Sequence, residues 1–531
     1  MLASMTKISG KSLIGFQEGA GSGEHLFATN PSTGERLQPG FVPATNEEVE
    51  RAARLAAEAF ETYRNVSGRD RAKFLRTIAA KIEAIADDII ERAMQETALP
   101  KARLQGETAR TCGQLRLFAQ VAEEGSWVNA RIDHADPDRK PAPKPDIRSM
   151  LRPLGPVVVF GASNFPLAFS VAGGDTASAL AGGNTVIVKA HQAHPGTSEL
   201  VGRAVQESVR ECGLPEGVFS MLFGSGSQIG TALMKHPLVK AGGFTGSRTA
   251  GRTLMDVAAS RPEPIPFYAE MSSTNPVFIL PGALRERGES IATGLHGSFT
   301  LGAGQFCTKP GMVFLPQGPD ATAFAGKLRE LVAGSAPFHL LTKAIHTSYD
   351  SAIAQRKKEV CVGVVAEGPK TTAAGFAVNS ALFETNAKSF LGSNLDEEIF
   401  GPTTLLVQHS SRGQVLQIAR ELEGHLTATI HGTEQDLHDF ADLVAILESK
   451  VGRLIFNGFP TGVEVTHAMV HGGPYPATSD GRSTSVGTQA IFRFTRLVCY
   501  QSFPDSALPD ELKEANPLKL WRFVDGKTSQ A

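Results

Sequence analysis

Cysteine is scarce in this chain and has no regular spacing. No two of the cysteines in the 531 residues have the separation of zinc ligands. A sparse, odd-numbered set also excludes the disulfide framework of a small secreted domain. We therefore expect free thiols in a reducing compartment, the cytoplasm, and no bound metal. The five cysteines are Cys112, Cys212, Cys307, Cys361 and Cys499.

Long apolar runs and an excess of one charge are missing as well. No stretch approaches the roughly 20 apolar residues of a membrane-spanning helix, and residues 1–19 lack the apolar centre of a signal peptide. The formal net charge is -2, and no basic stripe carries interleaved aromatic residues. These absences argue against a membrane or a nucleic acid as partner.

The composition and the first part of the chain predict a globular protein that begins with helices. Hydrophobic residues make up 41% and charged residues 20%, and a length of 531 residues predicts two or three domains. Thr45, with Glu48 three residues later, has the pattern of a capping box that opens a helix over 45–65. Further amphipathic stretches lie near 69–96 and 105–124.

From residue 156 onward, apolar runs typical of buried strands alternate with helical stretches. This alternation predicts a parallel, doubly wound sheet that is covered on both faces. A second α/β region over about 275–470 predicts a further sheet, and residues 492–500 are strand-like. The predicted strands are 156–162, 184–190, 217–224, 240–246, 266–271, 275–280 and 403–408. The predicted helices among them are 197–212, 226–235, 247–259 and 284–302.

Three polar residues follow predicted strands on the side where ligands bind in such sheets. Asn164, in FGASNFPLAFS, either donates an amide N–H to an oxyanion or caps a turn. Lys189 ends a strand and can reach ribose hydroxyls or a phosphate. Gln192 stands where dinucleotide sites often have an acid that binds the ribose 2′-hydroxyl, so NADP stays possible.

Two glycine turns join strands to helices in the same region. They are GSGSQIG (224–230) and FTGSRTAGR (244–252), and a helix N-terminus at such a turn suits a phosphate. Neither matches the GxGxxG fingerprint, and glycine is common at ordinary strand–helix turns. Phosphate binding and simple turn geometry therefore both remain open.

Glu270 and Cys307 are the candidate reactive residues. Glu270 ends a strand and is either a general base in a partly dry site or a solvated carboxylate. Cys307 lies in GQFCTKPG, where Gly304 permits close backbone approach. Lys309 either favours the thiolate or points away. On its own, a single cysteine is more often a small buried apolar residue.

The order of these motifs changes the interpretation. SNFP, VIVKA, FTGSRTAG, Glu270, GQFCTKPG and EEIFGP follow one another along the chain. Together they resemble the NAD(P)-dependent aldehyde dehydrogenase superfamily from about residue 30 to about residue 500. The closing stretch 453–488 is similar to the branch of 2-oxoglutarate semialdehyde (2,5-dioxopentanoate) dehydrogenases and related NADP-linked bacterial fatty-aldehyde dehydrogenases.

The resemblance implies a mechanism for the reactive residues. Cys307 attacks the aldehyde carbon, and Asn164 together with the Cys307 N–H stabilises the thiohemiacetal oxyanion. Hydride then leaves to the nicotinamide, and Glu270 activates water to hydrolyse the thioester. Phe306 and Ser163 depart from the usual family residues on the substrate path, which leaves the substrate range open.

The resemblance also implies a nicotinamide cofactor, with NADP slightly favoured over NAD. Lys189 and Glu398 hold the two riboses, and Ser247 with its helix N-terminus holds the pyrophosphate. Phe400 packs near the nicotinamide ribose. The implied cofactor-binding residues are Lys189, Gln192, Gly246, Ser247, Gly251, Glu398 and Phe400.

The family fold implies an α/β architecture in three parts. These are a Rossmann-type cofactor domain, an α/β catalytic domain and a small oligomerisation strand region. A homodimer or homotetramer is therefore expected. The boundaries are 1–134 and 155–272 for the cofactor domain, 273–480 for the catalytic domain, and 135–154 and 489–510 for the oligomerisation segment.

For the small-molecule substrate, the resemblance favours oxidation of 2-oxoglutarate semialdehyde to 2-oxoglutarate. A broad-range or fatty-aldehyde NADP dehydrogenase is the alternative, with Phe169 and Phe306 lining an apolar tunnel. A CoA-acylating enzyme is a further rival, which Glu270 disfavours because that class commonly lacks the base. A non-catalytic dinucleotide-binding relative is disfavoured by the intact Cys307, Glu270 and Asn164.

Overall fold

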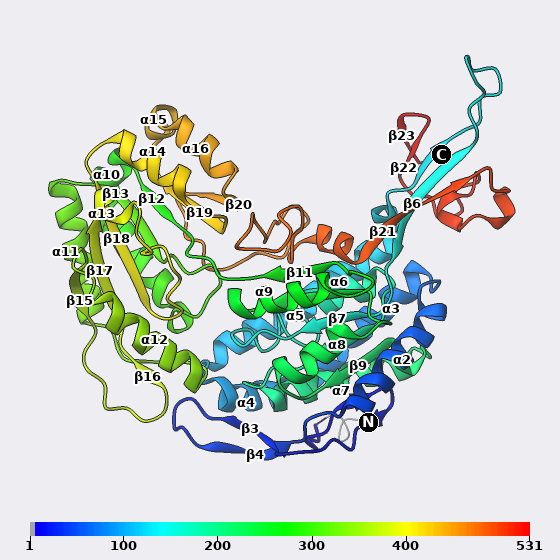
Figure 1. The fold of residues 1–531 in the computed structure, drawn as a ribbon, viewed down its shortest axis with the longest axis horizontal. Coiled ribbons are helices and arrows are strands. Elements are labelled where there is room, and N and C mark those ends of the chain that lie inside the picture. The colour runs from blue at the N-terminus through cyan, green and yellow to red at the C-terminus, as the bar shows by residue number, and fades with distance from the viewer. Residues whose placement is uncertain (1–5, 531) are drawn as a thin grey trace.

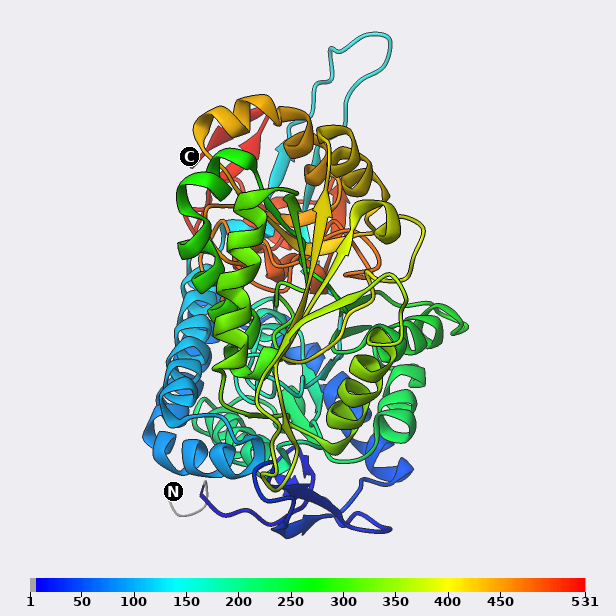
Figure 2. The same ribbon diagram turned by 90° about the vertical axis from the view of Figure 1, so that its left-hand side faces the viewer.

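The computed structural model describes residues 6–530. It has two lobes, each built on a seven-stranded sheet, and a narrow arm that rises from one of them (Figure 1). The N-terminal lobe is blue to green in this view, and the other lobe is green to orange. In the second view, the loop of residues 134–146 projects well beyond both lobes (Figure 2).

The N-terminal lobe contains the predicted parallel, doubly wound sheet. Its order is β11-β10-β7-β8-β9-β1-β2, and the five strands from β11 to β9 are parallel. The chain runs from β7 outward to β9, then returns to the other side of β7. The strands are β1 Leu13–Ile14, β2 Gln17–Glu18, β7 Val157–Phe160, β8 Val186–Lys189, β9 Phe219–Leu222, β10 Ala241–Thr245 and β11 Phe267–Glu270, with a separate hairpin β3 Leu26–Thr29 and β4 Arg36–Phe41.

Both faces of this sheet are covered, which explains the continuous apolar runs. Val157 and Val159 belong to one buried cluster, whereas Val158 and Phe160 belong to another. Successive side chains of a strand point to opposite faces, so a strand buried on both faces needs no polar alternation. The prediction of a sheet covered on both faces is confirmed.

Most helices of this lobe follow the prediction. Thr45 forms the predicted capping box with Glu48. The stretch 69–96 is two helices, because Ile85 has non-helical backbone angles (φ -122°, ψ 24°). The helices are α2 Asn46–Tyr63, α3 Gly68–Ala84, α4 Ala86–Thr97, α5 Lys101–Glu124, α6 Gly174–Ala181, α7 Pro195–Glu211, α8 Thr231–Lys235 and α9 Arg248–Ala259. Residues 226–230 form a π-helical turn before α8.

The second lobe is also α/β, as the sequence predicted. Its sheet order is β15-β17-β18-β13-β12-β19-β20, parallel except at β15. The strands are β12 Val277–Ile279, β13 Met312–Pro316, β15 Gly363–Glu367, β17 Ala381–Asn386, β18 Thr403–His409, β19 His425–His431 and β20 Val451–Phe456, with a small pair β14 Phe338–His339 and β16 Ala377–Val378. The helices are α10 Pro281–Thr300, α11 Pro319–Ala333, α12 Lys343–Arg356, α13 Ala387–Phe390, α14 Arg412–Glu421, α15 Glu434–Asp439 and α16 Ala441–Glu448.

The arm is a five-stranded sheet of order β21-β6-β5-β22-β23. The predicted strand at 492–500 is present but starts at Thr495, because residues 488–494 form a 3-10 helix. It pairs antiparallel with β6 along its whole length. Residues 522–529 add a hairpin to this sheet. The strands are β5 Arg131–Asp133, β6 Ile147–Pro153, β21 Thr495–Gln501, β22 Arg522–Val524 and β23 Lys527–Ser529.

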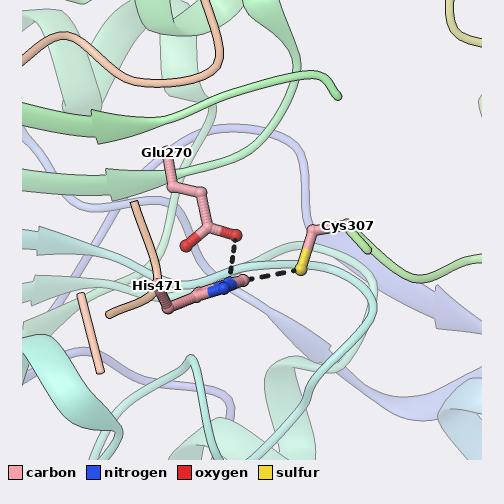
Figure 3. Close-up of side chains that lie close together, drawn as sticks. All are labelled: Glu270, Cys307 and His471. Carbon is pink, nitrogen blue, oxygen red and sulfur yellow. Dashed lines mark hydrogen bonds and ion pairs between the residues drawn. The ribbon is translucent and has the colours of Figure 1, made fainter. Parts of the chain in front are cut away.

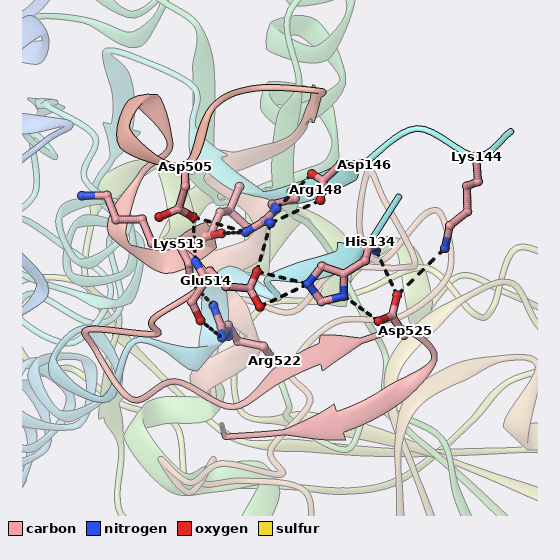
Figure 4. A network of polar contacts seen from close by, with 10 residues as sticks. His134, Lys144, Asp146, Arg148, Asp505, Lys513, Glu514, Arg522 and Asp525 are labelled. Carbon is pink, nitrogen blue, oxygen red and sulfur yellow. Dashed lines mark hydrogen bonds and ion pairs between the residues drawn. The ribbon is translucent and has the colours of Figure 1, made fainter. Parts of the chain in front are cut away.

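Charged side chains tie the tail to the base of the arm (Figure 4). His134 Nδ1 lies 2.6 Å from a carboxylate oxygen of Asp525, and His134 Nε2 lies 3.1 Å from Glu514. Arg148 in turn donates to Glu514 at 3.0 Å. Among residues 6–530, no helix has the length and hydropathy needed to cross a membrane.

Candidate active site

The predicted polar residues of the first sheet gather at one edge. Asn164 follows β7, Lys189 is the last residue of β8, Ser247 follows β10, and Glu270 ends β11. These strands are parallel, so their carboxyl ends meet at the same edge. The strand order reverses between β7 and β10, which is where open α/β sheets bind ligands.

Cys307 lies in a loop of the second lobe that is fixed by backbone contacts. The loop follows α10 and a short 3-10 turn. Gly304 has φ +68°, and a Cβ there would lie 2.2 Å from the carbonyl oxygen of Gly401, which confirms the predicted close approach. The Asn275 amide donates to the carbonyls of Cys307 at 2.8 Å and Lys309 at 3.0 Å. The thiol is therefore held by a rigid turn.

A histidine that the sequence reasoning missed lies between Glu270 and Cys307 (Figure 3). His471 Nε2 is 2.9 Å from Glu270 Oε1 and 3.5 Å from Cys307 Sγ. Ser485 Oγ donates to the other oxygen of Glu270 at 2.8 Å. His471 and Ser485 come from the stretch 453–488 that marked the branch, but no spacing rule connects either residue to Glu270 or Cys307.

The electrostatics of this group keep the resting thiol protonated. Burial, and then the negative charge of Glu270, raise the pKa of Cys307 well above its usual value, and Arg110 opposes this. Burial alone also raises the pKa of Glu270, but His471, Ser485 and Cys307 together hold it below its usual range. An ionised carboxylate therefore lies next to a neutral thiol, which is the arrangement of a base and its acid.

Donors for an oxyanion lie beside the sulfur. The Asn164 amide is buried and donates one hydrogen to the Gln305 carbonyl at 2.9 Å, which leaves its second hydrogen free. Among the residues that the structure describes, the backbone N–H of Cys307 has no hydrogen-bond partner. Both predicted donors are therefore available.

Lys309 takes the second of its two predicted alternatives and points away from Cys307. Its ammonium donates to the carbonyls of Ile399 at 2.7 Å and Thr403 at 3.1 Å. Burial lowers the pKa of Lys309, and the carboxylate of Glu398 opposes that shift. The lysine therefore holds the loop around 397–402 instead of activating the thiol.

A cavity of about 780 Å³ lies at the carboxyl edge of the first sheet. Lys189 is buried, makes no hydrogen bond or ion pair within residues 6–530, and has its pKa lowered by burial to about 8. Ser247 caps α9 through its hydroxyl, at the helix end that favours phosphate. A buried ammonium without a partner beside a helix N-terminus fits an anionic dinucleotide. The predicted residues that line the cavity are Lys189, Gln192, Gly246 and Ser247.

The other predicted cofactor residues lie outside this lining. Gly251 packs α9 close to β11, since a Cβ there would lie 2.8 Å from Met271. Glu398 lines a neighbouring cavity of about 420 Å³, and burial raises its pKa to about 7. Phe400 is half-buried in the same loop. Their roles toward a cofactor stay predictions.

The predicted substrate residues Phe169 and Phe306 belong to one aromatic cluster. Both ring centroids lie 5.2 Å from that of Phe165. Phe169 also lies 6.0 Å from the His471 ring. The cluster therefore forms an apolar wall beside the reactive group.

The three reactive side chains also have the spacing of metal ligands. The ligand atoms of Glu270, Cys307 and His471 lie within 4.8 Å of one another. The sequence predicts no metal, and a thiol, a base and free oxyanion donors together suit covalent catalysis. Each of the five cysteines is a free thiol.

Two α/β lobes with a reactive cysteine and a glutamate at their junction are the arrangement of a known class of enzymes. The profile of the aldehyde dehydrogenase family matches residues 17–496. The chain belongs to the aldehyde dehydrogenase family and is an oxidoreductase. Enzymes of this family use a nicotinamide cofactor, and the cavity beside Lys189 fits one.

Two relatives match almost the whole chain. Alpha-ketoglutaric semialdehyde dehydrogenase 2 of Azospirillum brasilense is 50% identical over 523 residues, which is 98% of this chain and 99% of that protein. Alpha-ketoglutaric semialdehyde dehydrogenase of Acinetobacter baylyi is 44% identical over 528 residues, 99% of this chain and 100% of that protein. The branch indicated by the closing stretch is confirmed.

Solved structures share the fold at low sequence identity. An aldehyde dehydrogenase from Bacillus cereus in complex with NAD+ has a TM-score of 0.80 at 21% identity, over 94% of this chain and 98% of that one. The 1-pyrroline-5-carboxylate dehydrogenase from Thermus with bound NAD has a TM-score of 0.78 at 21% identity, over 92% of each chain. The predicted fold class is confirmed.

Proposed function

We propose that this enzyme oxidises 2-oxoglutarate semialdehyde to 2-oxoglutarate with NADP or NAD. The observation that carries the chemistry is the contact of His471 with both Glu270 and Cys307, at 2.9 and 3.5 Å. The substrate assignment is supported by the names of the two relatives that match almost the full chain.

The first step is the activation of Cys307. Its thiol proton passes to Glu270, which accepts hydrogen bonds from His471 and Ser485. The sulfur then attacks the aldehyde carbon and forms a thiohemiacetal. The Cys307 N–H and the free amide hydrogen of Asn164 stabilise the oxyanion, and loss of one such donor typically costs about 10²–10³-fold in rate.

The second step breaks the thioester. When bound, the nicotinamide ring accepts the hydride that leaves the thiohemiacetal carbon. After Glu270 has released the thiol proton to solvent, its carboxylate takes a proton from a water molecule that attacks the thioester, and Cys307 leaves as thiolate. His471 orients the Glu270 carboxylate through Oε1.

The residues that would hold the cofactor follow from the cavity lining. Lys189 and Ser247 would bind a ribose and the pyrophosphate, and Gly246 and Gln192 line the same cavity. A neutral Gln192 does not repel a 2′-phosphate, which supports a slight preference for NADP over NAD. Gly251, Glu398 and Phe400 complete the proposed set.

The same proposal covers the domain roles, assembly and location. The first lobe acts as the cofactor domain and the second as the catalytic domain. β21 lies at the edge of the arm sheet, and its Leu497 is 64% exposed, which supports pairing in a homodimer or homotetramer. Free thiols support a cytoplasmic location.

The test is a spectrophotometric screen of NADPH and NADH formation. The wild type should oxidise 2-oxoglutarate semialdehyde faster than pentanal, should release free acid whether or not CoA is added, and should work at least as well with NADP as with NAD. Cys307→Ala should lose activity, with Cys361→Ala as the control at an exposed thiol. Full activity of Cys307→Ala, or acyl-CoA as product, would refute the mechanism.

A further inference from the structure

A further cavity, of about 520 Å³, is lined in part by Phe306. It lies between α5 and the segment that follows β20. Phe306 is the residue before Cys307, and the lining residue Arg110 is near enough to Cys307 to lower its pKa, so the cavity lies close to the sulfur. Three guanidinium groups, of Arg103, Arg110 and Arg453, line this cavity. Partly buried cations raise the free energy of the folded state unless anions or hydrogen-bond acceptors pair with them.

Two of the three arginines, Arg103 and Arg453, form ion pairs or hydrogen bonds within the protein. Arg103 pairs with Glu107 at 3.4 Å. Glu107 also accepts the backbone N–H groups of residues 167 and 168, at 2.9 and 3.0 Å. Arg453 donates to the carbonyls of Pro460 at 2.7 Å and Gly462 at 3.2 Å. These contacts hold the walls of the cavity.

Arg110 makes no such contacts among residues 6–530, and it leaves two buried nitrogens unpaired where Arg453 leaves only Nε. Its Nε and Nη2 are inaccessible to solvent and have no hydrogen-bond partner among the residues that the structure describes. Its guanidinium carbon lies 5.1 Å from the Phe169 ring and 6.0 Å from the Phe165 ring, so the group lies against the aromatic cluster. Burial lowers its pKa, and the charges of Glu107, Cys307 and Glu270 oppose that shift, which places it within electrostatic reach of the reacting groups.

We propose that Arg110 binds the carboxylate of the substrate while the aldehyde at the other end reaches Cys307. A guanidinium offers a carboxylate two parallel hydrogen bonds, and Arg110 has two buried N–H-bearing nitrogens without partners. The aromatic wall of Phe165, Phe169 and Phe306 contacts the carbon chain between the two ends. The enzyme therefore selects short aldehydes that carry a carboxylate.

The same features disfavour a long alkyl chain. An apolar tail in this cavity would lie against the guanidinium groups of Arg103 and Arg110 and would leave Arg110 without a partner. Glu464 also lines the opening and adds a further charge. The charged lining favours an anionic group of a small substrate over an apolar tail.

The inference rests on the proposed function and is tested with Arg110→Gln. Steady-state kinetics are measured with 2-oxoglutarate semialdehyde, succinic semialdehyde and the neutral pentanal. The KM for the two carboxylated aldehydes should rise about 10- to 100-fold, as expected for loss of charge-assisted hydrogen bonds. The KM for pentanal should change less than about twofold, and any fall in kcat that follows from a higher Cys307 pKa should be the same for all three aldehydes. An equal rise in KM with all three aldehydes, or no change in KM with any, would overturn the proposal.

A matched control lies on the same helix. Arg116 pairs with Glu83 at 2.6 Å at the surface, so Arg116→Gln should leave the kinetics with all three aldehydes unchanged. If Arg110→Gln fails to fold, wild-type pentanal oxidation is tested with glutarate and glutaramide as inhibitors. Glutarate should compete and glutaramide should not; equal inhibition by both would overturn the role of Arg110.

The outcome also separates the two proposals. Suppose the wild type rejects 2-oxoglutarate semialdehyde but prefers succinic semialdehyde to pentanal, and Arg110→Gln removes that preference. The substrate assignment then fails, whereas the carboxylate site stands. If the wild type oxidises 2-oxoglutarate semialdehyde and Arg110→Gln leaves its KM unchanged, the function stands and the role of Arg110 fails.

Discussion

A carboxylate and a guanidinium have opposite effects on the ionisation of the reactive thiol. Burial and Glu270 raise the pKa of Cys307, and Arg110 lowers it. The thiolate is both the nucleophilic and the easily oxidised form of cysteine. Keeping the resting sulfur protonated therefore protects it, and the adjacent Glu270 can still remove the proton when an aldehyde is bound.

This balance predicts the pH dependence of Cys307 alkylation. In the wild type, the rate of inactivation by iodoacetamide should rise only at a pH above the usual cysteine range, because burial and the Glu270 charge raise the pKa of Cys307. Glu270→Gln removes the charge but not the burial. The midpoint of the pH profile should therefore shift to lower pH, although turnover is lost with the base.

Glu398→Gln is the matched control for this prediction. Glu398 is half-buried and also raises the pKa of Cys307, but it is the smallest of the named contributions. Its removal should shift the alkylation midpoint less than Glu270→Gln does. Equal shifts for the two variants would mean that Glu270 is not the dominant charge at the sulfur.

At the scale of elements, the loop that carries Cys307 depends on the close approach of two backbones. Gly304 faces the Gly401 carbonyl, and Lys309 is tied to the carbonyls of Ile399 and Thr403. The 397–402 loop and the cysteine loop are thus fixed together. Any shift of one should displace the other, including the thiol.

Gly304→Ala should therefore reduce both stability and activity. A left-handed φ costs a non-glycine residue about 1–3 kcal/mol, and the new Cβ would also meet the Gly401 oxygen. Thermal unfolding and kcat are the measurements. Gly297→Ala in α10 is the control, since a Cβ there has open space; alanine in an exposed helix should stabilise by about 0.5–1 kcal/mol. An unchanged Gly304→Ala enzyme would contradict this account.

The sequence predicted those elements and residues that have a local signal. Thr45 and Glu48 carry the cap of α2, and alternating strand and helix patterns gave the sheet around Lys189 and Glu270. Cys307 required the order of motifs along the chain. His471 was missed because its role depends on a contact with residues 201 and 164 positions away. The direction of Lys309 was left open because sequence does not fix where a side chain points.

On the scale of the whole molecule, the arm joins segments that are distant in the chain. The family resemblance placed the segments of β6 and β21 in one oligomerisation region, but no local signal indicated the hairpin of β22 and β23, in which Arg522 is buried and the other residues are half-buried or exposed. This hairpin extends the sheet by pairing with β5. The contacts of His134 with Asp525 and Glu514 add a charged tie near the chain end (Figure 4).

This tie should weaken at alkaline pH. The Asp525 hydrogen bond, and then that of Glu514, raise the pKa of His134 above 6.5, and His134 lowers the pKa of Asp525 below 3.8. The histidine contribution is complete below about pH 6.5 and is lost as the pH rises through its raised pKa. The aspartate contribution is present above about pH 4 and is lost on acidification.

Hydrogen exchange of residues 522–529, corrected for the intrinsic effect of pH, measures the tie. Protection should be greater at pH 6 than at pH 9 in the wild type, and His134→Gln should remove the difference. His438→Gln is the control, because His438 is an exposed histidine whose one ion pair within residues 6–530 is with the adjacent Asp439. If the loss of protection between pH 6 and pH 9 persists in His134→Gln, titratable groups other than His134 cause it.

The three reactive side chains have a consequence for refolding. Glu270 ends a strand of the first sheet, Cys307 lies in a loop of the second lobe, and His471 lies in the segment that returns the chain toward the first. Neither lobe contains the complete set. When the denatured enzyme is diluted into buffer, helical circular dichroism can return while each lobe folds on its own. Catalysis can return only after the lobes have met and the later segment has closed over them, so turnover reports the last stage of assembly.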